Sequence, residues 1–203
     1  MATRPVGQCR PGAGAATRVD ARHVADTGAM RRHRPDPVRD RWTTPMRLAL
    51  AEAALAPPTG DVPVGCVVLG PDGSVIGRGH NEREAVGDPT AHAEMVAIRE
   101  AAEAVCEWRL TGCTLVVTLE PCTMCAGAIV LSRVDRVVYG AVDDKAGAAG
   151  SLWDVIRDRR LNHRPEVVPG VLAEECGAVL TSFFDGHRAD PAPVKAPGAG
   201  KDF

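Results

Sequence analysis

The chain has 203 residues, which is enough for one globular domain with a substantial core and two tails. Its net charge of −2 is uneven, because residues 1–40 contain eight arginines against four aspartates and the remainder therefore carries −6. A domain that binds nucleic acid is often basic overall, so this balance argues against long-range attraction to RNA or DNA, and no apolar run is long enough to span a membrane.

The chain begins with a stretch, residues 1–41, that is rich in Arg, Pro, Gly and Ala and has little hydrophobic periodicity. Such a composition buries too little apolar surface to order itself, so we expect a disordered extension. Two other interpretations stay open: a basic arm that contacts RNA phosphates, and sequence upstream of a later start at Met30 or Met46. Residues 189–203 are again rich in Pro, Ala and Gly and are expected to form a disordered tail, which leaves 42–188 as the folded domain.

Helical and strand patterns alternate through the expected domain. Thr44 and Pro45 are typical of a helix start, with Thr44 as N-cap and Pro45 at the first helical position. An apolar, β-branched run over residues 62–69 predicts a buried strand, and residues 75–81, beyond a turn sequence, are expected to return as the second strand of a hairpin. Asn81 ends the second strand of this hairpin, where a side chain can reach a pocket.

The rest of the domain continues the alternation. Beyond the hairpin, helices are expected over residues 91–105, 121–132, 152–160 and 174–187, and strands over residues 113–119, 136–141 and 166–171. In the last helix the side chains expected to face inward are Val179, Leu180, Phe183 and Phe184. A strand, a helix and a strand in succession form a right-handed parallel crossover. The predicted fold class is therefore α/β, a three-layer α/β/α arrangement in which helices cover both faces of a mixed five-stranded sheet.

A candidate metal site lies at Cys122 and Cys125, read together with His92. Two thiolates and an imidazole form a ligand set that zinc accepts readily. A structural zinc site normally closes with four protein ligands, whereas a catalytic site keeps one position open for water. Three ligands present themselves here, at predicted helix N-termini whose backbone N–H groups stabilise thiolates. The sequence therefore predicts a catalytic zinc site.

Glu94 stands two residues after His92, which places a carboxylate beside the predicted metal. Each half of the motif alone has a plain alternative: a Cys-x-x-Cys can be a redox pair, part of a structural zinc site or an accident of helix packing, and His-x-Glu occurs on many helix faces. Together, with Pro121 directly before Cys122, they match the signature of zinc deaminases that act on nucleobases. In that chemistry Glu94 moves protons, first as a general base and then as a general acid.

The cysteine count is odd, with thiols at positions 9, 66, 106, 113, 122, 125 and 176. No signal peptide is recognisable, so we expect a soluble protein of the reducing cytoplasm whose thiols are free or bound to metal. Cys66 and Cys113 lie in apolar runs typical of buried strands. Cys106 and Cys176 follow helical patterns and stay open as candidates for a fourth metal ligand.

Two later stretches bear on phosphate or RNA binding. The glycine-rich loop over residues 143–151 lacks the Lys-Ser/Thr ending of a phosphate loop, so binding of a nucleoside triphosphate is not expected. The densest positive patch of the domain follows it and consists of Arg157, Arg159, Arg160, His163 and Arg164. This patch is either a solvated face or a contact for RNA phosphates, and both interpretations stay open.

Beyond the zinc motif, the chain resembles the bacterial tRNA-specific adenosine deaminase family from about Trp42 to Phe184. The blocks that carry the resemblance are Pro63–Gly65, Asp88–Glu94, Thr118–Ala128, Lys145–Leu152 and Asn162–Arg164. The resemblance implies the cytidine deaminase-like form of the α/β/α fold and a homodimer. It also implies one zinc ion per subunit, held by His92, Cys122 and Cys125.

The resemblance further implies a reaction and a partner. The reaction is hydrolytic deamination of adenosine to inosine at the wobble position of a tRNA anticodon, and the partner is the anticodon stem-loop. Glu94 would shuttle protons, Asn81 would contact the flipped nucleotide, and Asp143 would lie near the RNA backbone. Without the resemblance, Asn81 could equally cap a strand end and Asp143 could be a solvated loop charge.

Two other functions stay open on the sequence. A free nucleoside or free base deaminase, acting on cytidine or guanine, would use the same zinc motif. A zinc-dependent RNA-binding module without turnover would need no carboxylate beside the metal, so Glu94 argues against it. Activity on small nucleosides compared with folded tRNA separates the two enzymes, and zinc content without ammonia release would indicate the binding module.

Overall fold

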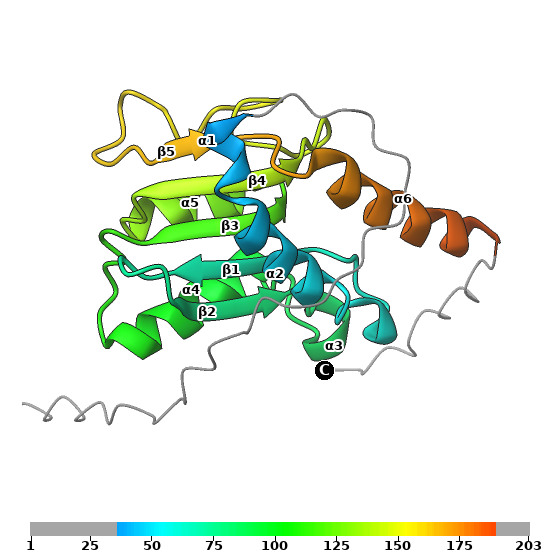
Figure 1. Ribbon diagram of the computed structural model, residues 1–203. Helices are drawn as coiled ribbons and strands as arrows, with labels where there is room; N and C mark the ends of the chain where they lie inside the picture. The colour runs from blue at the N-terminus through cyan, green and yellow to red at the C-terminus, as the bar shows by residue number, and fades with distance from the viewer. Residues whose placement is uncertain (1–35, 190–203) are drawn as a thin grey trace, which may run out of the picture.

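The computed structural model describes residues 36–189, and its middle layer is a five-stranded sheet with the strand order β2-β1-β3-β4-β5 (Figure 1). The strands are β1 (Gly65–Leu69), β2 (Val75–His80), β3 (Thr114–Leu119), β4 (Arg136–Ala141) and β5 (Glu166–Val168). β1 pairs antiparallel with β2 and with β3, whereas β4 pairs parallel with β3 and with β5. The sheet is therefore mixed and five-stranded, which confirms the predicted fold class.

Helices cover both faces of this sheet (Figure 1). On one face lie α2 (Thr43–Ala53) and α6 (Ala173–Ala189), and on the other lie α4 (Ala93–Val105) and α5 (Thr123–Leu131). The short elements are α1 (Pro37–Asp40), the 3₁₀ helix η1 (Pro57–Thr59) and α3 (Arg83–Val86). No helix within residues 36–189 is both long and apolar enough to cross a membrane.

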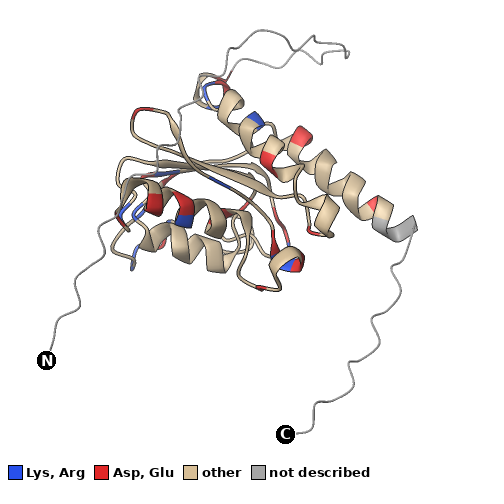
Figure 2. Cartoon of the chain, turned by 90° about the horizontal axis from the view of Figure 1, so that it is seen from below, with Lys and Arg blue, Asp and Glu red and all other residues tan. Residues whose placement is uncertain are grey.

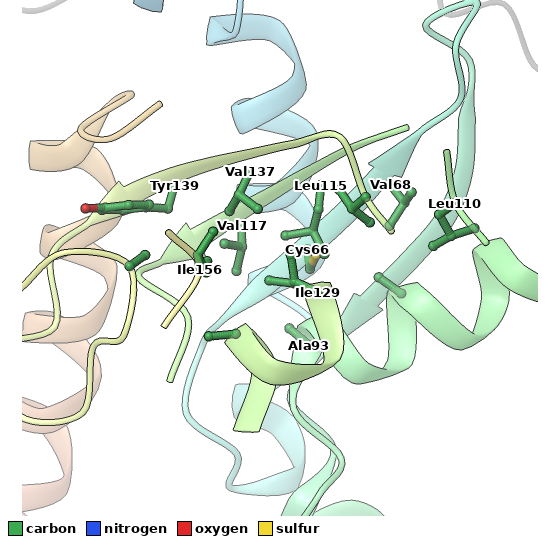
Figure 3. Close-up of a cluster of buried hydrophobic side chains, with 14 of the residues drawn as sticks. Cys66, Val68, Ala93, Leu110, Leu115, Val117, Ile129, Val137, Tyr139 and Ile156 are labelled. Carbon is green, nitrogen blue, oxygen red and sulfur yellow. The ribbon is translucent and has the colours of Figure 1, made fainter. Parts of the chain in front are cut away.

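Side chains of the central strands alternate between two cores. Val67, Val116 and Val138 point into the core beneath α2, where Met46 and Ala49 are fully buried. The neighbours of these valines point the other way, into the core beneath α4 and α5 that Figure 3 shows: Cys66, Val68, Leu115, Val117, Val137 and Tyr139. Strands that are buried on both faces read as nearly continuous apolar runs, which is the pattern that predicted them.

β2 approaches α4 closely because it carries glycine where the helix crosses it. A Cβ on Gly79 would lie 2.4 Å from the carbonyl oxygen of Ala93, and one on Gly77 would lie 2.3 Å from that of Ala97. Ala93, Ala97 and Ala101 are themselves fully buried. Small residues on both sides therefore set the height of α4 above the sheet, and with it the position of the first turn of α4.

The helix α2 starts two residues earlier than predicted. The helix begins at Thr43, so Thr44 is not the N-cap, and Trp42 before it makes no side-chain cap hydrogen bond. Pro45 lies within the first turn instead of at the first helical position. The prediction was wrong because proline fits anywhere in the first turn, where its missing N–H leaves no intrahelical bond unmade.

The helix expected over residues 152–160 does not form, and the segment folds into turns. Asp154 accepts a hydrogen bond from the backbone N–H of Arg157 at 3.3 Å, and Asp158 accepts one from the N–H of Arg160 at 2.9 Å. Aspartate side chains that bond to nearby backbone offer the chain an alternative to the helix. The helix prediction was therefore wrong for this segment.

α6 is a helix as predicted, but its buried face differs from the prediction. Val179, Leu180 and Phe183 are partly buried, and Phe184 is 47% exposed. Cys176, nearer the start of α6, is buried in the core shared with α2. The reason is positional, because the second half of α6 runs past the end of the sheet and has no strand beneath it (Figure 1).

Part of the expected disordered extension has a defined structure. Pro37–Asp40 forms α1, and the carboxylate of Asp36 caps this helix by accepting a hydrogen bond from the backbone N–H of Val38 at 3.1 Å. Four residues of the stretch expected to be disordered are therefore helical. The expectations for residues 1–35 and 190–203 lie outside the described residues.

Candidate active site

Two helix starts meet at one point of the domain. His92 is the N-cap of α4 and Cys122 is the N-cap of α5, each with an extended backbone. The helices thus begin two residues later than predicted. In this arrangement Nδ1 of His92 lies 3.7 Å from Sγ of Cys122 and 3.6 Å from Sγ of Cys125. The fold brings together the three side chains that the sequence proposed as ligands.

The spacing of the three ligand atoms suits a zinc ion. Bonds of about 2.3 Å to sulfur and about 2.0–2.1 Å to nitrogen, at tetrahedral angles, place the two donor atoms roughly 3.6 Å apart. Within residues 36–189, the group able to hold a metal is His92, Cys122 and Cys125, and neither Cys106 nor Cys176 belongs to it. The two candidates for a fourth ligand are therefore wrong, and three protein ligands remain, as in a catalytic zinc site.

Hydrogen bonds within this group favour a thiolate. The pKa of the Cys122 thiol is lowered to about 4, because Cys125 donates a hydrogen bond to it and His92 does the same. The pKa of His92 is raised by its hydrogen bond to Cys122. The pKa of Cys125 is raised by its hydrogen bond to Cys122 and by burial. Cys122 therefore presents an anionic sulfur, which the N–H groups at the start of α5 stabilise further.

Glu94 lies beside this group, in the first turn of α4, and is only 4% exposed. Burial, together with the charge of the nearby Cys122, raises the pKa of Glu94 to about 7. Its carboxyl group also shares a hydrogen bond with the thiol of Cys125. A carboxyl group in this position can exchange protons with a molecule bound at the metal.

Asn81 follows β2 directly and is 8% exposed. Its Oδ1 accepts a hydrogen bond from the backbone N–H of Ala93 at 3.0 Å, and its Nδ2 donates one to the carbonyl of Val62 at 3.0 Å. Asn81 thus caps the first N–H of α4, a helix start, whereas the alternative interpretation had it cap a strand end. The amide keeps a second N–H and a second oxygen lone pair, so a contact to substrate is compatible with this role.

Asp143 lies in the glycine-rich loop that follows β4 and is partly exposed. Its Oδ1 accepts hydrogen bonds from the backbone N–H groups of Lys145 and Ala146 at 2.9 and 3.1 Å. This carboxylate therefore shapes its own loop through one oxygen. The loop itself is hydrogen-bonded to the residue that follows β3, directly before the segment that contains Cys122 and Cys125.

The residue that makes this connection is Glu120, which the sequence reasoning missed. Glu120 is 2% exposed and accepts hydrogen bonds from the backbone N–H groups of Asp143, Ala149 and Ser151 at 3.2, 2.9 and 3.0 Å. The signal that could have found it is a charged residue at the end of a buried apolar strand, because a buried carboxylate must have hydrogen-bond donors.

Asp61 is a second buried carboxylate that the sequence reasoning missed, at 2% exposure. It accepts hydrogen bonds from the backbone N–H groups of Glu84 and Ala85 at 2.8 and 3.1 Å, and from the hydroxyl of Thr59 at 2.9 Å. Burial acts to raise the pKa of Asp61, but these hydrogen bonds lower it below its ordinary value. Asp61 thus anchors α3, the helix between β2 and His92.

The predicted positive patch is partly neutralised by aspartates of the same segment. Arg157 pairs with Asp154 at 2.9 Å, and Arg160 pairs with Asp158. Arg157 also reaches towards the body of the domain, where its Nη2 lies 3.5 Å from the carbonyl oxygen of Ala149. Figure 2 shows positions of both signs interspersed along the ribbon of the domain.

Sequence comparison identifies relatives of this chain. Residues 41–141 match the family described as "Cytidine and deoxycytidylate deaminase zinc-binding region". The tRNA-specific adenosine deaminase of Bacillus subtilis is 52% identical over 139 residues, which cover 68% of this chain and 86% of the relative. The tRNA-specific adenosine deaminase of Haemophilus influenzae is 48% identical over 151 residues, which cover 74% of this chain and 87% of the relative.

Solved structures include relatives of the same shape. One structure comes from studies of A-to-I editing by tRNA:A34 deaminases at the wobble position of transfer RNA. It superposes with a TM-score of 0.64 at 44% identity, over 66% of this chain and 97% of that chain. The guanine deaminase of Nitrosomonas europaea superposes with a TM-score of 0.57 at 24% identity, over 75% of this chain and 86% of the guanine deaminase chain. At that identity the likeness to the guanine deaminase shows the fold alone.

Proposed function

The chain belongs to the tRNA-specific adenosine deaminase family, and on that premise we propose that it converts adenosine to inosine at the wobble position of a tRNA anticodon, with release of ammonia. The observation that carries this proposal is the buried carboxyl group of Glu94 beside three side chains spaced to hold zinc. A site built only to stabilise the fold would need no proton-transfer group at the metal. The catalytic domain would comprise residues 42–188.

The ligands His92, Cys122 and Cys125 would hold zinc and leave one coordination position for the reaction. When bound, zinc supplies the Lewis acidity that makes water reactive near neutral pH. Glu94 accepts a proton from that water as its oxygen bonds to C6 of the adenine, and delivers a proton to N1 of the ring. Glu94 would then take the second proton from the new hydroxyl group on C6 and pass it to the amino group, which leaves as ammonia, so one carboxyl group acts as base and then as acid.

The adenine must leave its stack to reach this site. An anticodon loop lowers that cost because its bases are unpaired and can turn outward. Asn81, at the edge of the site, would contact the flipped nucleotide through the amide N–H that it does not use in capping. Asp143 would lie near the RNA backbone. Arg159 and Arg164 are better candidates for phosphate contacts than Arg157 and Arg160, whose charges are paired with aspartates.

We further propose that the functional unit is a homodimer formed through the outer face of α5. Cys125, Ala126, Ile129 and Val130 of this helix are buried in the core. The opposite face is also apolar and presents Met124, Gly127, Ala128 and Leu131, of which Leu131 is 68% exposed. These positions are spaced three and four residues apart, so they form one stripe. A second copy could cover this stripe with the same stripe of its own α5.

The cytoplasm is the compartment that suits this assignment. Five cysteines within residues 36–189 are free thiols, two of them in the zinc group. Thiols remain reduced in the cytoplasm and are oxidised in secretory compartments. A tRNA substrate would be present there as well.

The experiment that tests the proposed function compares substrates under one condition. Turnover is measured on an anticodon stem-loop with adenosine at the wobble position, on free adenosine, on free cytidine and on guanine, with the Glu94→Gln protein as the background control. We expect efficient deamination of the stem-loop and negligible action on the small molecules, because binding energy from the stem-loop holds the base in place. Comparable rates on a small molecule would move the assignment to nucleoside or base salvage.

A second experiment identifies the natural substrate. The protein is incubated with a total tRNA pool, and the RNA is sequenced for adenosines that are newly read as guanosine. New guanosine reads at wobble positions alone would support the proposal. Reads scattered over other unpaired adenosines would contradict the assignment to the wobble position, although the zinc chemistry would stand.

A further inference from the structure

The carboxylate of Glu120 lies inside the loop of residues 143–151. Its Oε1 accepts the N–H groups of Ala149 and Ser151 at 2.9 and 3.0 Å, and its Oε2 accepts the N–H of Asp143 at 3.2 Å. These partners are 23 to 31 residues away in sequence. The side chain of Glu120 therefore holds both ends of the loop beside the chain position directly before Pro121.

Further contacts hold the loop against the zinc-ligand segment. The backbone N–H of Ala148 donates to the carbonyl of Pro121 at 2.8 Å, and Gly147 forms a β-bridge with Cys122. A Cβ on Gly147 would lie 2.6 Å from Cδ of Glu120. Glycine is therefore required where the loop passes the carboxylate, and the loop packs directly on the segment that contains a zinc ligand.

A glycine-rich loop whose N–H groups converge is an anion-binding arrangement. In this loop the anion is supplied by the chain itself, because the carboxylate of Glu120 occupies the position that a phosphate would take. The sequence excluded a nucleoside triphosphate for lack of a Lys-Ser/Thr ending. The structure adds a second reason, since Glu120 already satisfies these N–H groups.

The same hydrogen bonds determine where Asp143 lies. The N–H of Asp143 donates to Glu120, and its carbonyl accepts hydrogen bonds from the N–H of Gly147 at 2.9 Å and from the hydroxyl of Ser151 at 3.0 Å. Both backbone groups of Asp143 are thus held within a unit that is organised around Glu120. Displacement of this unit would move the Asp143 side chain relative to His92 and the cysteines.

We propose that Glu120 is a positioning residue, which places the loop of residues 143–151, and Asp143 within it, for binding of the RNA. The proposal rests on the proposed function, because it takes Asp143 as a contact to the RNA backbone. Glu120 would act on substrate binding and not on proton transfer, since its three hydrogen bonds all point into the loop and none reaches the zinc group.

The test is a double-mutant cycle between Glu120→Gln and Asp143→Ala, with kcat and KM measured on the anticodon stem-loop. Glutamine has the size of glutamate, but its NH2 group would face at least one backbone N–H of the loop. We expect KM to rise about tenfold, the size of one lost hydrogen bond to a charged group, with kcat nearly unchanged and full zinc content. If Glu120 acts through Asp143, the double variant should bind no more weakly than Asp143→Ala alone.

Two outcomes would overturn the proposal: additive effects of the two substitutions, or a fall in kcat with unchanged KM. Glu166→Gln is the matched control, since it removes a half-exposed glutamate from β5 and should leave KM unchanged. Should Glu120→Gln fail to fold, Ser151→Ala removes only the bond to the Asp143 carbonyl. It should raise KM less, and again without additivity with Asp143→Ala.

Amide hydrogen exchange gives a readout that is independent of activity. In the Glu120→Gln protein, exchange should accelerate at Ala149 and Ser151 and stay unchanged in β1 and α4. Unchanged protection of the loop would overturn the positioning role. If instead the wild-type protein shows no turnover of the stem-loop, the proposed function fails while the effect of Glu120 on the loop remains measurable.

Discussion

Oδ1 of Asn81 accepts a hydrogen bond from the backbone N–H of Ala93 at 3.0 Å, so the residue that ends β2 caps the start of α4. The N-cap position itself is occupied by His92, which makes no side-chain cap hydrogen bond. Its imidazole faces the two cysteines instead. Asn81, at the end of β2, therefore supplies the capping hydrogen bond that the side chain of His92 does not make.

Replacement of Asn81 should weaken both the fold and the zinc site. Asn81→Ala leaves the buried N–H of Ala93 without an acceptor, so we expect a loss of about 1–3 kcal/mol in unfolding free energy and weaker zinc binding in competition with a chelator. Asn81→Asp keeps the acceptor oxygen and should recover part of both. Equal zinc affinity in the wild-type and alanine proteins would show that the cap does not position His92.

Removal of either cysteine ligand should abolish zinc binding. We expect about one zinc per chain in the wild-type protein, and far less in Cys122→Ala and Cys125→Ala, because two remaining ligands cannot close the site. Cys176→Ala is the matched control, since this thiol is buried in the opposite core and should affect stability alone. Metal analysis of the purified proteins measures the difference, and full occupancy in either ligand variant would remove the assignment.

Glu94→Gln should keep the metal and the fold but lose most turnover. The carboxyl group moves protons and is not a ligand, and general acid–base catalysis contributes roughly 10²–10⁴-fold. Glu103→Gln, at an exposed position of the same helix, should have the activity of the wild type. Single-turnover rates on the stem-loop measure the effect, and a rate within about tenfold of the wild type would contradict the role of Glu94.

Gly79→Ala should destabilise the protein because the added methyl would meet the carbonyl of Ala93 at 2.4 Å. Overpacking of this kind costs about 1–3 kcal/mol, and we expect weaker zinc binding as α4 shifts. Gly177→Ala, on α6 with open space around it, should instead stabilise the protein by about 0.5–1 kcal/mol. Chemical denaturation of both variants tests the pair, and equal effects would refute the packing argument.

If the proposed dimer forms through α5, Leu131→Glu should convert it to a monomer. The substitution places a charge on the apolar stripe of α5, where the side chain is 68% exposed and adds nothing to the core. Val86→Glu, at another exposed apolar position, should leave the oligomeric state unchanged. Sedimentation velocity of both variants distinguishes a monomer from a dimer. A dimer that survives Leu131→Glu would place the interface elsewhere.

Amino-acid types and short spacings were enough to predict each half of the zinc group and the layers of the fold. His92 and Glu94 lie within one helical turn, as do Cys122 and Cys125, so their proximity follows from local geometry. The valine-rich strands are read from runs that are buried on both faces. The ligand pairs and the strands could be predicted because their side chains have a distinct chemistry and the residues of each pair or strand are close in sequence.

Tertiary structure alone decided the hydrogen-bond partners of Asn81 and Glu120 and the exposure of Phe184. Asn81 and Glu120 bond to backbone N–H and carbonyl groups 12 to 31 residues away. Every residue except proline has the same backbone donor and acceptor, so a sequence shows which side chains can accept a hydrogen bond but not which backbone groups the fold will bring to them.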